Sequence, residues 1–583
     1  MNKLLVANRG EIAVRIIRTA REMGIATVAV YSEIDRDAMH VRMADEAFLI
    51  GPAAPSQSYL DTAKLVAVAQ RAGAQGIHPG YGFLAENAAF AREVIAAGCI
   101  WIGPHPGAIE AMGDKMRARQ AMIAAGVPVV PGGTEAIEND AQARAAAAQY
   151  GLPLALKASG GGGGKGLKVA HTLDDLAPAL ATAQREALAY FKNGAVYAER
   201  YLDNPKHVEL QILADKHGTV LHVGDRDCSL QRRHQKLWEE APATISEHVR
   251  DGMREAGIRA AQAIGYDSVG TIECLVSGDA FYFLEMNTRI QVEHTVSEMI
   301  SGLDLIREQI RIAAGEPLGY AQNDVAFRGF AIEGRVNAED PAQHFRPAPG
   351  TLAAYREPAG PGVRVDSAAY PGFVISPDYD SMIAKLIVWA PTREHAIARL
   401  RRAIDEFVIE GVPTTLPLLR ALCDNPRVQQ ATYGTATLEA FAAERYGEAA
   451  SAPGAGTAPA MPPEGAQEAI RVEVNGQLFR VRLIDLPAGA QRPRGGTRPP
   501  PRAAHKKRSV QASGDDVVSP MHGVVVELHA KTGDDVRQGQ VLAVIEAMKM
   551  MNEVRAHKSG AVGAVHVKAG DTVEAQSALV TIA

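Results

Sequence analysis

The feature that most constrains this 583-residue sequence is the stretch from Phe281 to His294, in which polar and apolar residues alternate. An extended chain places alternate residues on one face. The residues that would share the polar face are Glu285, Asn287, Arg289, Gln291 and Glu293. Acids, amides and a guanidinium cannot be packed dry without partners, so the stretch predicts a groove where two carboxylates and an amide hold Mg²⁺ beside an arginine that receives an anion. The alternative is an ordinary half-buried strand with a polar outer face.

Length and composition exclude several classes of protein. A chain of 583 residues predicts several domains. The net charge of -6 predicts no polyanionic partner, and four cysteines without a CxxC pair predict neither a disulfide framework nor a zinc site. The apolar run near the start, residues 4–7, is too short for a signal peptide, and no apolar stretch reaches the length of a membrane span. We expect a soluble, cytoplasmic protein that binds neither membrane nor nucleic acid.

The amino-terminal segment predicts parallel α/β layering. Residues 3–7 and 25–31 have the composition of buried strands, and 11–23 has helical apolar spacing between them. Gly10 alone falls short of the GxGxxG dinucleotide motif, so a structural role for this Rossmann-like unit is favoured. The glycine-punctuated segment 78–87 predicts a turn.

A run of five glycines, 160–164, lies between two predicted strands, 152–156 and 167–170. Such a run allows backbone N–H groups to close over phosphates and allows the loop to move as a lid. It differs from a P-loop, which opens a helix. Lys115 and Lys157 are candidates for phosphate contacts, although the segment could also be a bare flexible hairpin.

Further candidate residues lie in short segments between this run and residue 336. Glu199–Leu202 follows a strand start and could act as a hinge whose backbone reads adenine. If 227–236 is extended rather than a basic surface loop, it places three donors at a common site. The individual candidates are His207, Gln231, His234, Lys236, Glu273 and Arg335; Glu273 would hold Mg²⁺ together with Glu285 from an adjacent strand.

The carboxyl-terminal third contains linkers, a hairpin and a repeat. Residues 441–469 are rich in Ala, Pro and Gly and predict a linker. Two alternating runs in 470–484 predict a β-hairpin about Asn475-Gly476. Residues 488–510 carry seven Lys or Arg and no acid, which predicts a second, disordered linker. Nucleic-acid binding there is disfavoured, because no aromatic residues interleave the charges.

The last residues repeat themselves. Residues 533–545 recur as 570–582, and Gly523 maps to Gly560 at the same offset, which predicts a small β-sandwich with internal two-fold symmetry. Lys549 lies between the halves, flanked by methionines, at a predicted exposed turn. A covalent attachment point presented to a modifying enzyme explains this lysine better than packing does.

Together these motifs resemble the biotin-dependent carboxylases over nearly the whole chain. The glycine lid, the Glu–Asn–Arg–Gln–Glu stretch and the carrier motif Ala547-Met-Lys-Met550 occur in the order that this family has. The resemblance implies an α/β protein with a Rossmann-like domain, an ATP-grasp domain and an α+β carboxyl-terminal domain, followed by an all-β biotinyl domain. The expected boundaries are 1–113, 114–330 with a lid subdomain at about 131–203, 331–446, a linker at 447–515 with the hairpin, and 516–583.

The resemblance also implies roles for residues. Those implied to contact ATP are Lys115, Lys157, Gly161, Gly162, Gly163, Gly164, Glu199, Leu202, His207, Gln231 and His234. The implied ligands of Mg²⁺ (or Mn²⁺) are Glu273, Glu285 and Asn287. The implied bicarbonate site is Arg289, Gln291, Val292 and Lys236. Glu293 would be the base, Arg335 would stabilise the enolate of biotin, and Lys549 would carry biotin covalently.

The expected function is ATP-dependent carboxylation of biotin on the chain's own carrier domain, as the α subunit of an acetyl- or propionyl-CoA carboxylase. The expected partners are a separate carboxyltransferase (β) subunit, a biotin protein ligase and further copies of the chain. A split pyruvate or 2-oxoacid carboxylase is the alternative. A third hypothesis, an interaction protein with an inactive ATP-grasp body, is disfavoured by the presence of all the implied catalytic residues. A lipoyl carrier is disfavoured because lipoyl lysines usually follow Asp rather than Met.

Overall fold

The structure is a computed structural model. It describes residues 1–160, 166–191, 193–447, 470–474, 477–481, 514–521, 523–547, 550–574 and 576–583. The predicted glycine lid, Gly161 to Gly164, and the predicted biotin site, Lys549, lie outside these residues, as do most of the two predicted linkers.

The amino-terminal part is a parallel five-stranded sheet in the order β3-β2-β1-β4-β5. Its strands are β1 (Lys3–Val6), β2 (Ala26–Ser32), β3 (Glu46–Gly51), β4 (Gly76–His78) and β5 (Ile100–Trp101). Its helices are α1 (Gly10–Glu22), α2 (Met39–Met43), α3 (Thr62–Ala72), α4 (Ala88–Ala96) and α5 (Pro106–Gly113). The first strand, helix and second strand lie within one residue of the predicted ranges.

A small antiparallel sheet, β7-β6-β8, precedes the main sheet in the chain and packs against two helices. It consists of β6 (Leu154–Ala158), β7 (Leu167–Ala170) and β8 (Val196–Arg200), with α6 (Lys115–Ala124), α7 (Asp140–Tyr150) and α8 (Leu176–Phe191) in the same region. The two strands predicted on either side of the glycines are confirmed. The first strand begins and ends two residues later than predicted.

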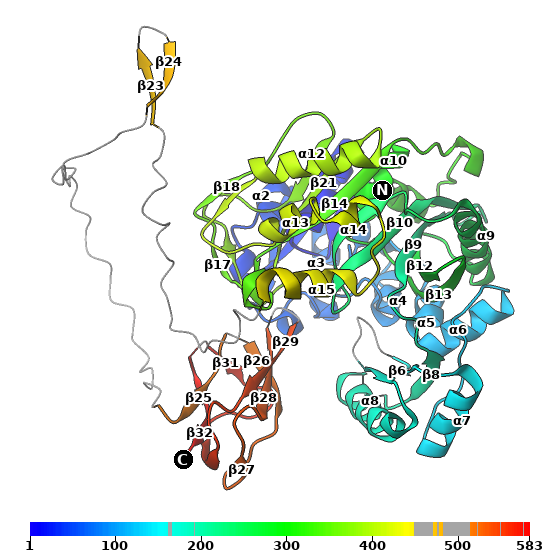
Figure 1. Cartoon of the computed structure of the whole chain (residues 1–583). Helices are drawn as coiled ribbons and strands as arrows, with labels where there is room; N and C mark the ends of the chain where they lie inside the picture. Colours follow the sequence, from blue (N-terminus) through cyan, green and yellow to red (C-terminus); the bar gives the residue numbers. More distant parts are fainter. Residues whose placement is uncertain are drawn as a thin grey trace.

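The main sheet has eight strands in the order β13-β12-β9-β10-β11-β14-β21-β19, and it joins strands from residues 206–287 to strands from residues 330–390 (Figure 1). Its strands are β9 (Lys206–Ala214), β10 (Val220–Arg232), β11 (Gln235–Ala241), β12 (Val269–Ser277), β13 (Ala280–Asn287), β14 (Phe330–Asn337), β19 (Val363–Ser367) and β21 (Met382–Ala390). The helices associated with this part are α9 (Glu247–Ala263), α10 (His294–Ser301), α11 (Leu305–Ala313), α12 (Arg393–Glu406), α13 (Leu416–Leu422), α14 (Pro426–Gln429) and α15 (Thr437–Tyr446). Helix α12 packs its buried apolar face against β14 and β21.

A turn interrupts both the alternating stretch 281–294 and the segment 227–236, for which an extended chain was one of two alternatives. Strand β13 ends at Asn287, and residues 288–293 form a turn that leads into α10. The segment 227–236 is a hairpin, because Arg233 and His234 adopt φ values of 46° and 67° between β10 and β11. Left-handed backbone usually calls for Gly or Asn, so the sequence carries no signal for this turn.

The last strands form two four-stranded sheets, β25-β32-β30-β27 and β29-β28-β26-β31. They are β25 (Asp516–Val518), β26 (Gly523–Leu528), β27 (Asp535–Val536), β28 (Val541–Ala547), β29 (Met550–Arg555), β30 (Gly560–Val565), β31 (Thr572–Val573) and β32 (Ala578–Ile582). The repeat relates β26 to β30, β27 to β31 and β28 to β32. When the strands of each pair are exchanged, their order in one sheet becomes their order in the other. A Cβ at Gly523 would lie 2.5 Å from the Glu546 carbonyl oxygen, and one at Gly560 would lie 2.4 Å from that of Ala583, so the two-fold sandwich predicted by the repeat is confirmed.

Strands β23 (Ile470–Val474) and β24 (Gln477–Val481) pair antiparallel, as predicted for the hairpin. In the part of the chain that the structure describes, no helix is both long enough and apolar enough to span a membrane.

Candidate active site

The candidate site is organised around the ammonium group of Lys236, near the start of β11. Its Nζ donates to Glu209 Oε2 at 2.6 Å, Glu273 Oε1 at 2.9 Å and Glu293 Oε1 at 2.6 Å, and it lies 3.3 Å from Gln291 Oε1. Burial alone would lower the pKa of Lys236, but the three carboxylates raise that pKa well above its ordinary value. One cation therefore binds side chains from β9, β12 and the turn after β13.

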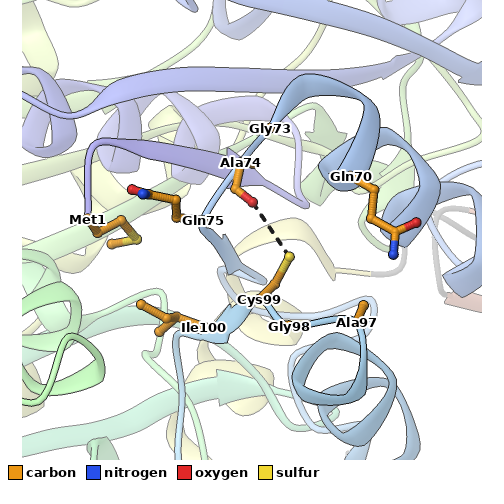
Figure 2. Close-up of a pocket in the computed structure, with 9 residues that line it drawn as sticks. All are labelled: Met1, Gln70, Gly73, Ala74, Gln75, Ala97, Gly98, Cys99 and Ile100. Carbon is orange, nitrogen blue, oxygen red and sulfur yellow. Dashed lines mark hydrogen bonds between the residues drawn. The ribbon is translucent and has the colours of Figure 1, made fainter.

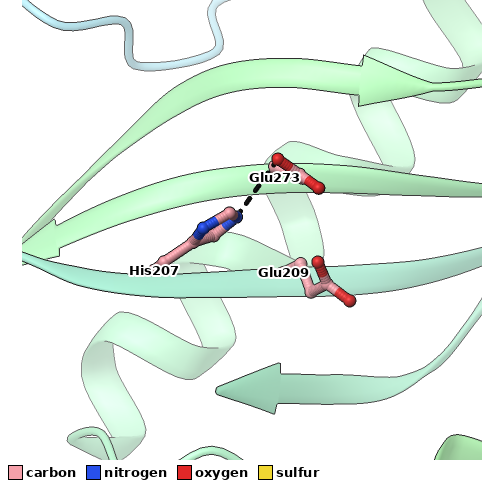
Figure 3. Close-up of side chains that lie close together, drawn as sticks. All are labelled: His207, Glu209 and Glu273. Atoms are coloured by element: carbon pink, nitrogen blue, oxygen red, sulfur yellow. Dashed lines mark ion pairs between the residues drawn. The ribbon is translucent and has the colours of Figure 1, made fainter. Parts of the chain in front are cut away.

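Glu273 is the second centre of the cluster. Its carboxylate accepts hydrogen bonds from Asn287 Nδ2 and Gln291 Nε2, each at 2.9 Å, and it lies 3.1 Å from His207 Nε2 (Figure 3). Burial would raise the pKa of Glu273, whereas Lys236 and His207 lower it well below its ordinary value. Burial would lower the pKa of His207, but the contact with Glu273 raises it above its ordinary value.

The predicted metal ligands come from neighbouring strands. Glu273 and Glu285 lie directly opposite each other in the β12–β13 pairing, and Asn287 lies two residues further along β13. Two carboxylates and an amide oxygen are hard oxygen donors of the kind that Mg²⁺ prefers, so these residues fit that ion. A second buried group, His207, Glu209 and Glu273, also brings ligand atoms within 4.8 Å of one another, but Lys236 and Arg226 already bind the carboxylate of Glu209.

The turn after β13 carries the predicted anion site. Arg289 donates from Nη2 to Asn287 Oδ1 at 2.9 Å and from Nε to Glu86 Oε2 at 3.0 Å. Glu86 also accepts the backbone N–H of Thr288 at 3.1 Å. A carboxylate from the amino-terminal part thus holds the guanidinium and the backbone of this turn. Burial would lower the pKa of Arg289, but Glu86 and Glu293 raise it.

Glu293 and Arg335 form the far end of the cluster. Arg335 donates from Nη2 to Glu293 Oε2 at 2.9 Å and from Nε to Glu239 Oε1 at 2.6 Å. Burial would raise the pKa of Glu293, but Lys236 and Arg335 hold it well below its ordinary value, so Glu293 is ionised at neutral pH. Burial raises the pKa of the Cys228 thiol, which lies 3.9 Å from Glu293, well above its ordinary value; this thiol is neutral and structural.

The predicted nucleotide side has its own ion pairs. Lys115, at the start of α6, pairs with Glu285, and Lys157, on β6, pairs with Glu199. Arg119 also donates to Glu199 at 2.8 Å. Burial would raise the pKa of Glu199, but Lys157 and Arg119 lower it. Both lysines therefore already hold carboxylates, and Lys115 holds one of the predicted metal ligands.

The structure brings most of the predicted residues together. Gln231 lies opposite Lys236 in the β10–β11 hairpin, and its Nε2 lies 3.1 Å from His207 Nδ1. His234 is exposed at the tip of that hairpin, and Leu202 follows β8. Although residues 288–293 are a turn rather than the predicted strand, Arg289, Gln291 and Glu293 still converge on the cluster.

Five residues that complete the site are not among those predicted from the sequence. These are Glu86, Glu209, Arg226, Glu239 and Lys385. Four of them bind a predicted site residue directly, and Arg226 binds Glu209. Only Glu209 had a local signal, its alternation with His207. The others come from segments whose pattern is that of ordinary core or loop.

A cavity of about 490 Å³ lies elsewhere, at the edge of the amino-terminal sheet (Figure 2). It is lined largely by small and apolar residues, and Cys99 Sγ points to the Ala74 carbonyl oxygen at 3.5 Å. Of the residues predicted to bind or react, none lines it.

Four protein families match successive parts of the chain. They are described as biotin carboxylase, N-terminal domain (residues 1–109), carbamoyl-phosphate synthase L chain, ATP binding domain (114–321), biotin carboxylase C-terminal domain (333–440) and biotin-requiring enzyme (515–582).

Individual proteins are similar over long stretches. The biotin-dependent acyl-coenzyme A carboxylase alpha3 subunit of Mycobacterium leprae is 44% identical over 100% of this chain and 98% of its own. A pyruvate carboxylase subunit from Methanothermobacter thermautotrophicus is 51% identical over 73% of this chain and 87% of its own. The biotin carboxylase domain of Hydrogenobacter thermophilus 2-oxoglutarate carboxylase, solved with MgADP, ADP and bicarbonate, superposes with a TM-score of 0.73 at 48% identity over 76% of this chain and 98% of that one.

Proposed function

The chain belongs to the biotin carboxylases and carries its own biotinyl carrier domain, and from that premise we propose that it carboxylates this carrier as the α subunit of an acyl-CoA carboxylase. One observation carries the choice of acceptor class. The acyl-CoA carboxylase relative aligns with all of this chain, carrier included, whereas the pyruvate carboxylase relative aligns with 73% of it. The proposed partners are a separate carboxyltransferase subunit, which passes the carboxyl group to an acyl-CoA, and a biotin protein ligase.

The proposed nucleotide site exchanges ion pairs when its ligands bind. Lys115 and Lys157 would leave Glu285 and Glu199 and bind phosphate oxygens. Glu273, Glu285 and Asn287 would hold Mg²⁺, whose charge neutralises the phosphates. The relative solved with MgADP and bicarbonate supports this ligand set by its similarity. His207, Gln231, His234 and the segment Glu199–Leu202 would complete the ATP site, with residues 161–164 closing over it.

The proposed bicarbonate site uses the cations of the turn and of β11. Arg289 and Lys236 would hold the anion, with Gln291 and the backbone of Val292 beside it. Glu293, ionised in the structure, would take the proton of bicarbonate while a bicarbonate oxygen attacks the γ-phosphorus of ATP and ADP leaves. The product of this step is carboxyphosphate, which is needed because bicarbonate itself is a poor electrophile.

Arg335 would then stabilise negative charge on the ureido oxygen of biotin. Bound biotin would supply the nucleophilic nitrogen that receives the carboxyl group. Carboxyphosphate would break down to CO₂ and phosphate beside it, and that phosphate would take the proton of the nitrogen as the nitrogen attacks CO₂. The guanidinium of Arg335 is held between Glu293 and Glu239, so it faces the same turn as the proposed bicarbonate site. Lys549 is the proposed point of biotin attachment.

The test follows labelled bicarbonate through the full chain, isolated by an affinity tag together with any protein that co-purifies, so that a variant without biotin is recovered in the same way. ATP-dependent fixation is measured with acetyl-, propionyl- and longer acyl-CoAs and with pyruvate, for the wild type and for Lys549→Ala. Fixation into an acyl-CoA that the substitution abolishes is the expected result. Fixation into pyruvate alone would transfer the assignment to the 2-oxoacid class, which the 2-oxoglutarate carboxylase and pyruvate carboxylase relatives represent. Absence of bicarbonate-dependent ATP hydrolysis would refute the proposal.

A further inference from the structure

We propose that Lys385 is a positioning residue that holds the turn carrying Glu293, by fixing the carbonyl group of Val292. The inference rests on the proposed function, in which Glu293 takes the proton of bicarbonate. It adds a residue from β21, 92 positions further along the chain than Glu293.

The register of the sheet places Lys385 beside Arg335. The two residues are directly opposite each other in the antiparallel pairing of β14 and β21, and opposed residues of such a pair point to the same face. Arg335 Nη2 binds the Glu293 carboxylate at 2.9 Å, and Lys385 Nζ donates to the Val292 carbonyl oxygen at 2.9 Å. Adjacent cations of one sheet face therefore hold two consecutive residues of the turn.

This contact orients the peptide that joins Val292 to Glu293. A peptide unit is planar and its carbonyl and N–H point in opposite directions, so binding the Val292 oxygen fixes the direction of the Glu293 N–H and of the Glu293 Cα. The turn needs such support because it lies beyond the end of β13 and is not part of the sheet ladder. Rotation of this peptide would displace the Glu293 carboxylate from Lys236 and Arg335.

Burial of the Lys385 ammonium group destabilises the fold unless the charge forms favourable contacts. The side chain is fully buried, with Glu11 Oε2 at 3.3 Å and Asp366 Oδ2 at 3.8 Å. Burying an ammonium group costs several kcal/mol before any pairing, and an apolar side chain would fill the same space without that cost. Glu11 also accepts a hydrogen bond from Tyr81 of the segment 78–87, so Lys385 connects the amino-terminal part to the turn.

The test separates positioning from charge balance by removing the buried cation and its nearest anion together. The double variant Lys385→Met/Glu11→Gln loses the Val292 contact but leaves no new net charge, and Glu11→Gln alone retains the lysine. Lys216→Met controls for the loss of a lysine-to-carbonyl hydrogen bond, because Lys216, which is exposed, donates to the Ala313 carbonyl oxygen at 3.0 Å, away from the site. The full chain is used, with bicarbonate-dependent ATP hydrolysis as the assay and thermal unfolding as a measure of folding.

A charge-assisted hydrogen bond of this kind corresponds to a factor of about 10 to 100. We expect kcat/KM for bicarbonate to fall by about 10-fold or more in the double variant, with the KM for ATP unchanged, and no such loss in Glu11→Gln or Lys216→Met. An unchanged kcat/KM for bicarbonate in the double variant, or a rise in the KM for ATP as large as the loss for bicarbonate, would overturn the inference. Wild-type protein without bicarbonate-dependent hydrolysis would instead overturn the proposed function, so the two failures are distinguishable.

Discussion

The strongest electrostatic prediction concerns Lys236. Replacing it by glutamine removes the one ammonium group that binds Glu209, Glu273 and Glu293, whose side chains are 0%, 7% and 2% exposed. Breaking a buried ion pair by removing one partner costs about 3–5 kcal/mol. The three carboxylates lose three bonds, but Arg226, His207 and Arg335 still bind one carboxylate each. We therefore expect a loss of about 3–5 kcal/mol at pH 7.5 rather than three times that amount.

The contribution of Glu273 and Glu293 to the pH dependence of folding stability should change sign in this variant. In the wild type the pKa values of Glu273 and Glu293 are lowered in the folded state, so their contribution to stability is present above the ordinary Glu pKa and is lost as the pH falls below it. Without Lys236, burial and mutual repulsion raise the pKa of at least one of these carboxyls. A raised acid pKa makes the folded state bind a proton more tightly, so the stability that Lys236→Gln loses relative to the wild type should be smaller at pH 5.5 than at pH 7.5.

The assay is thermal or urea unfolding at these two pH values, followed by tryptophan fluorescence; one of the three tryptophans, Trp238, is fully buried in β11 two residues from Lys236. Lys64→Gln is the control, because Lys64 and Asp61 form a surface pair, 45% and 28% exposed, whose loss costs under about 1 kcal/mol. A Lys236→Gln variant that loses the same stability at both pH values, or no more than the control, would refute the reasoning.

Three further predictions address single groups. Glu293→Gln and Arg335→Met should each reduce carboxylation of the carrier by at least about 100-fold and leave ATP affinity, measured by calorimetry, within about 2-fold; a parallel loss of ATP affinity would contradict the separation of the two sites. Glu86→Gln should raise the KM for bicarbonate by about 10-fold, because it weakens a charge-assisted bond to Arg289, and an unchanged KM would mean that Arg289 needs no such support. Burial raises the pKa of Glu339 to about 7, so the wild type should lose about 2 kcal/mol of stability from this group as the pH rises from 5 to 7. Glu339→Gln should remove this part of the change in unfolding free energy with pH. An identical change with pH in the variant would refute the raised pKa of Glu339.

The sequence predicted those parts of the fold that local periodicity encodes. Alternation along 281–287 and helical spacing along 11–23 report directly which face of an element is buried. The carboxyl-terminal repeat was equally informative, because two copies of one strand pattern can bury their apolar faces only against each other. The resemblance of the motifs to one family then supplied roles for residues that spacing alone left open.

Local pattern was insufficient where a turn interrupts an alternating segment. Arg233 and His234 adopt left-handed backbone without glycine or asparagine, and residues 288–293 leave the sheet although polar and apolar residues continue to alternate. In neither place does the local pattern alone determine the turn. For residues 288–293, contacts with distant parts of the chain hold the turn. Glu86 binds the Thr288 N–H and Lys385 binds the Val292 carbonyl.

By itself, then, the sequence determined the elements, the two-fold sandwich and the residue types of the site. Only the tertiary structure decided which carboxylate each cation binds. That choice depends on the strand order β13-β12-β9-β10-β11-β14-β21 and on its registers, which bring Lys236, Glu273 and Arg335 together from separate segments. The physical reason is that periodicity along a chain specifies which face of a strand is buried, whereas a salt bridge forms between side chains whose distance is set by strand pairing and domain packing.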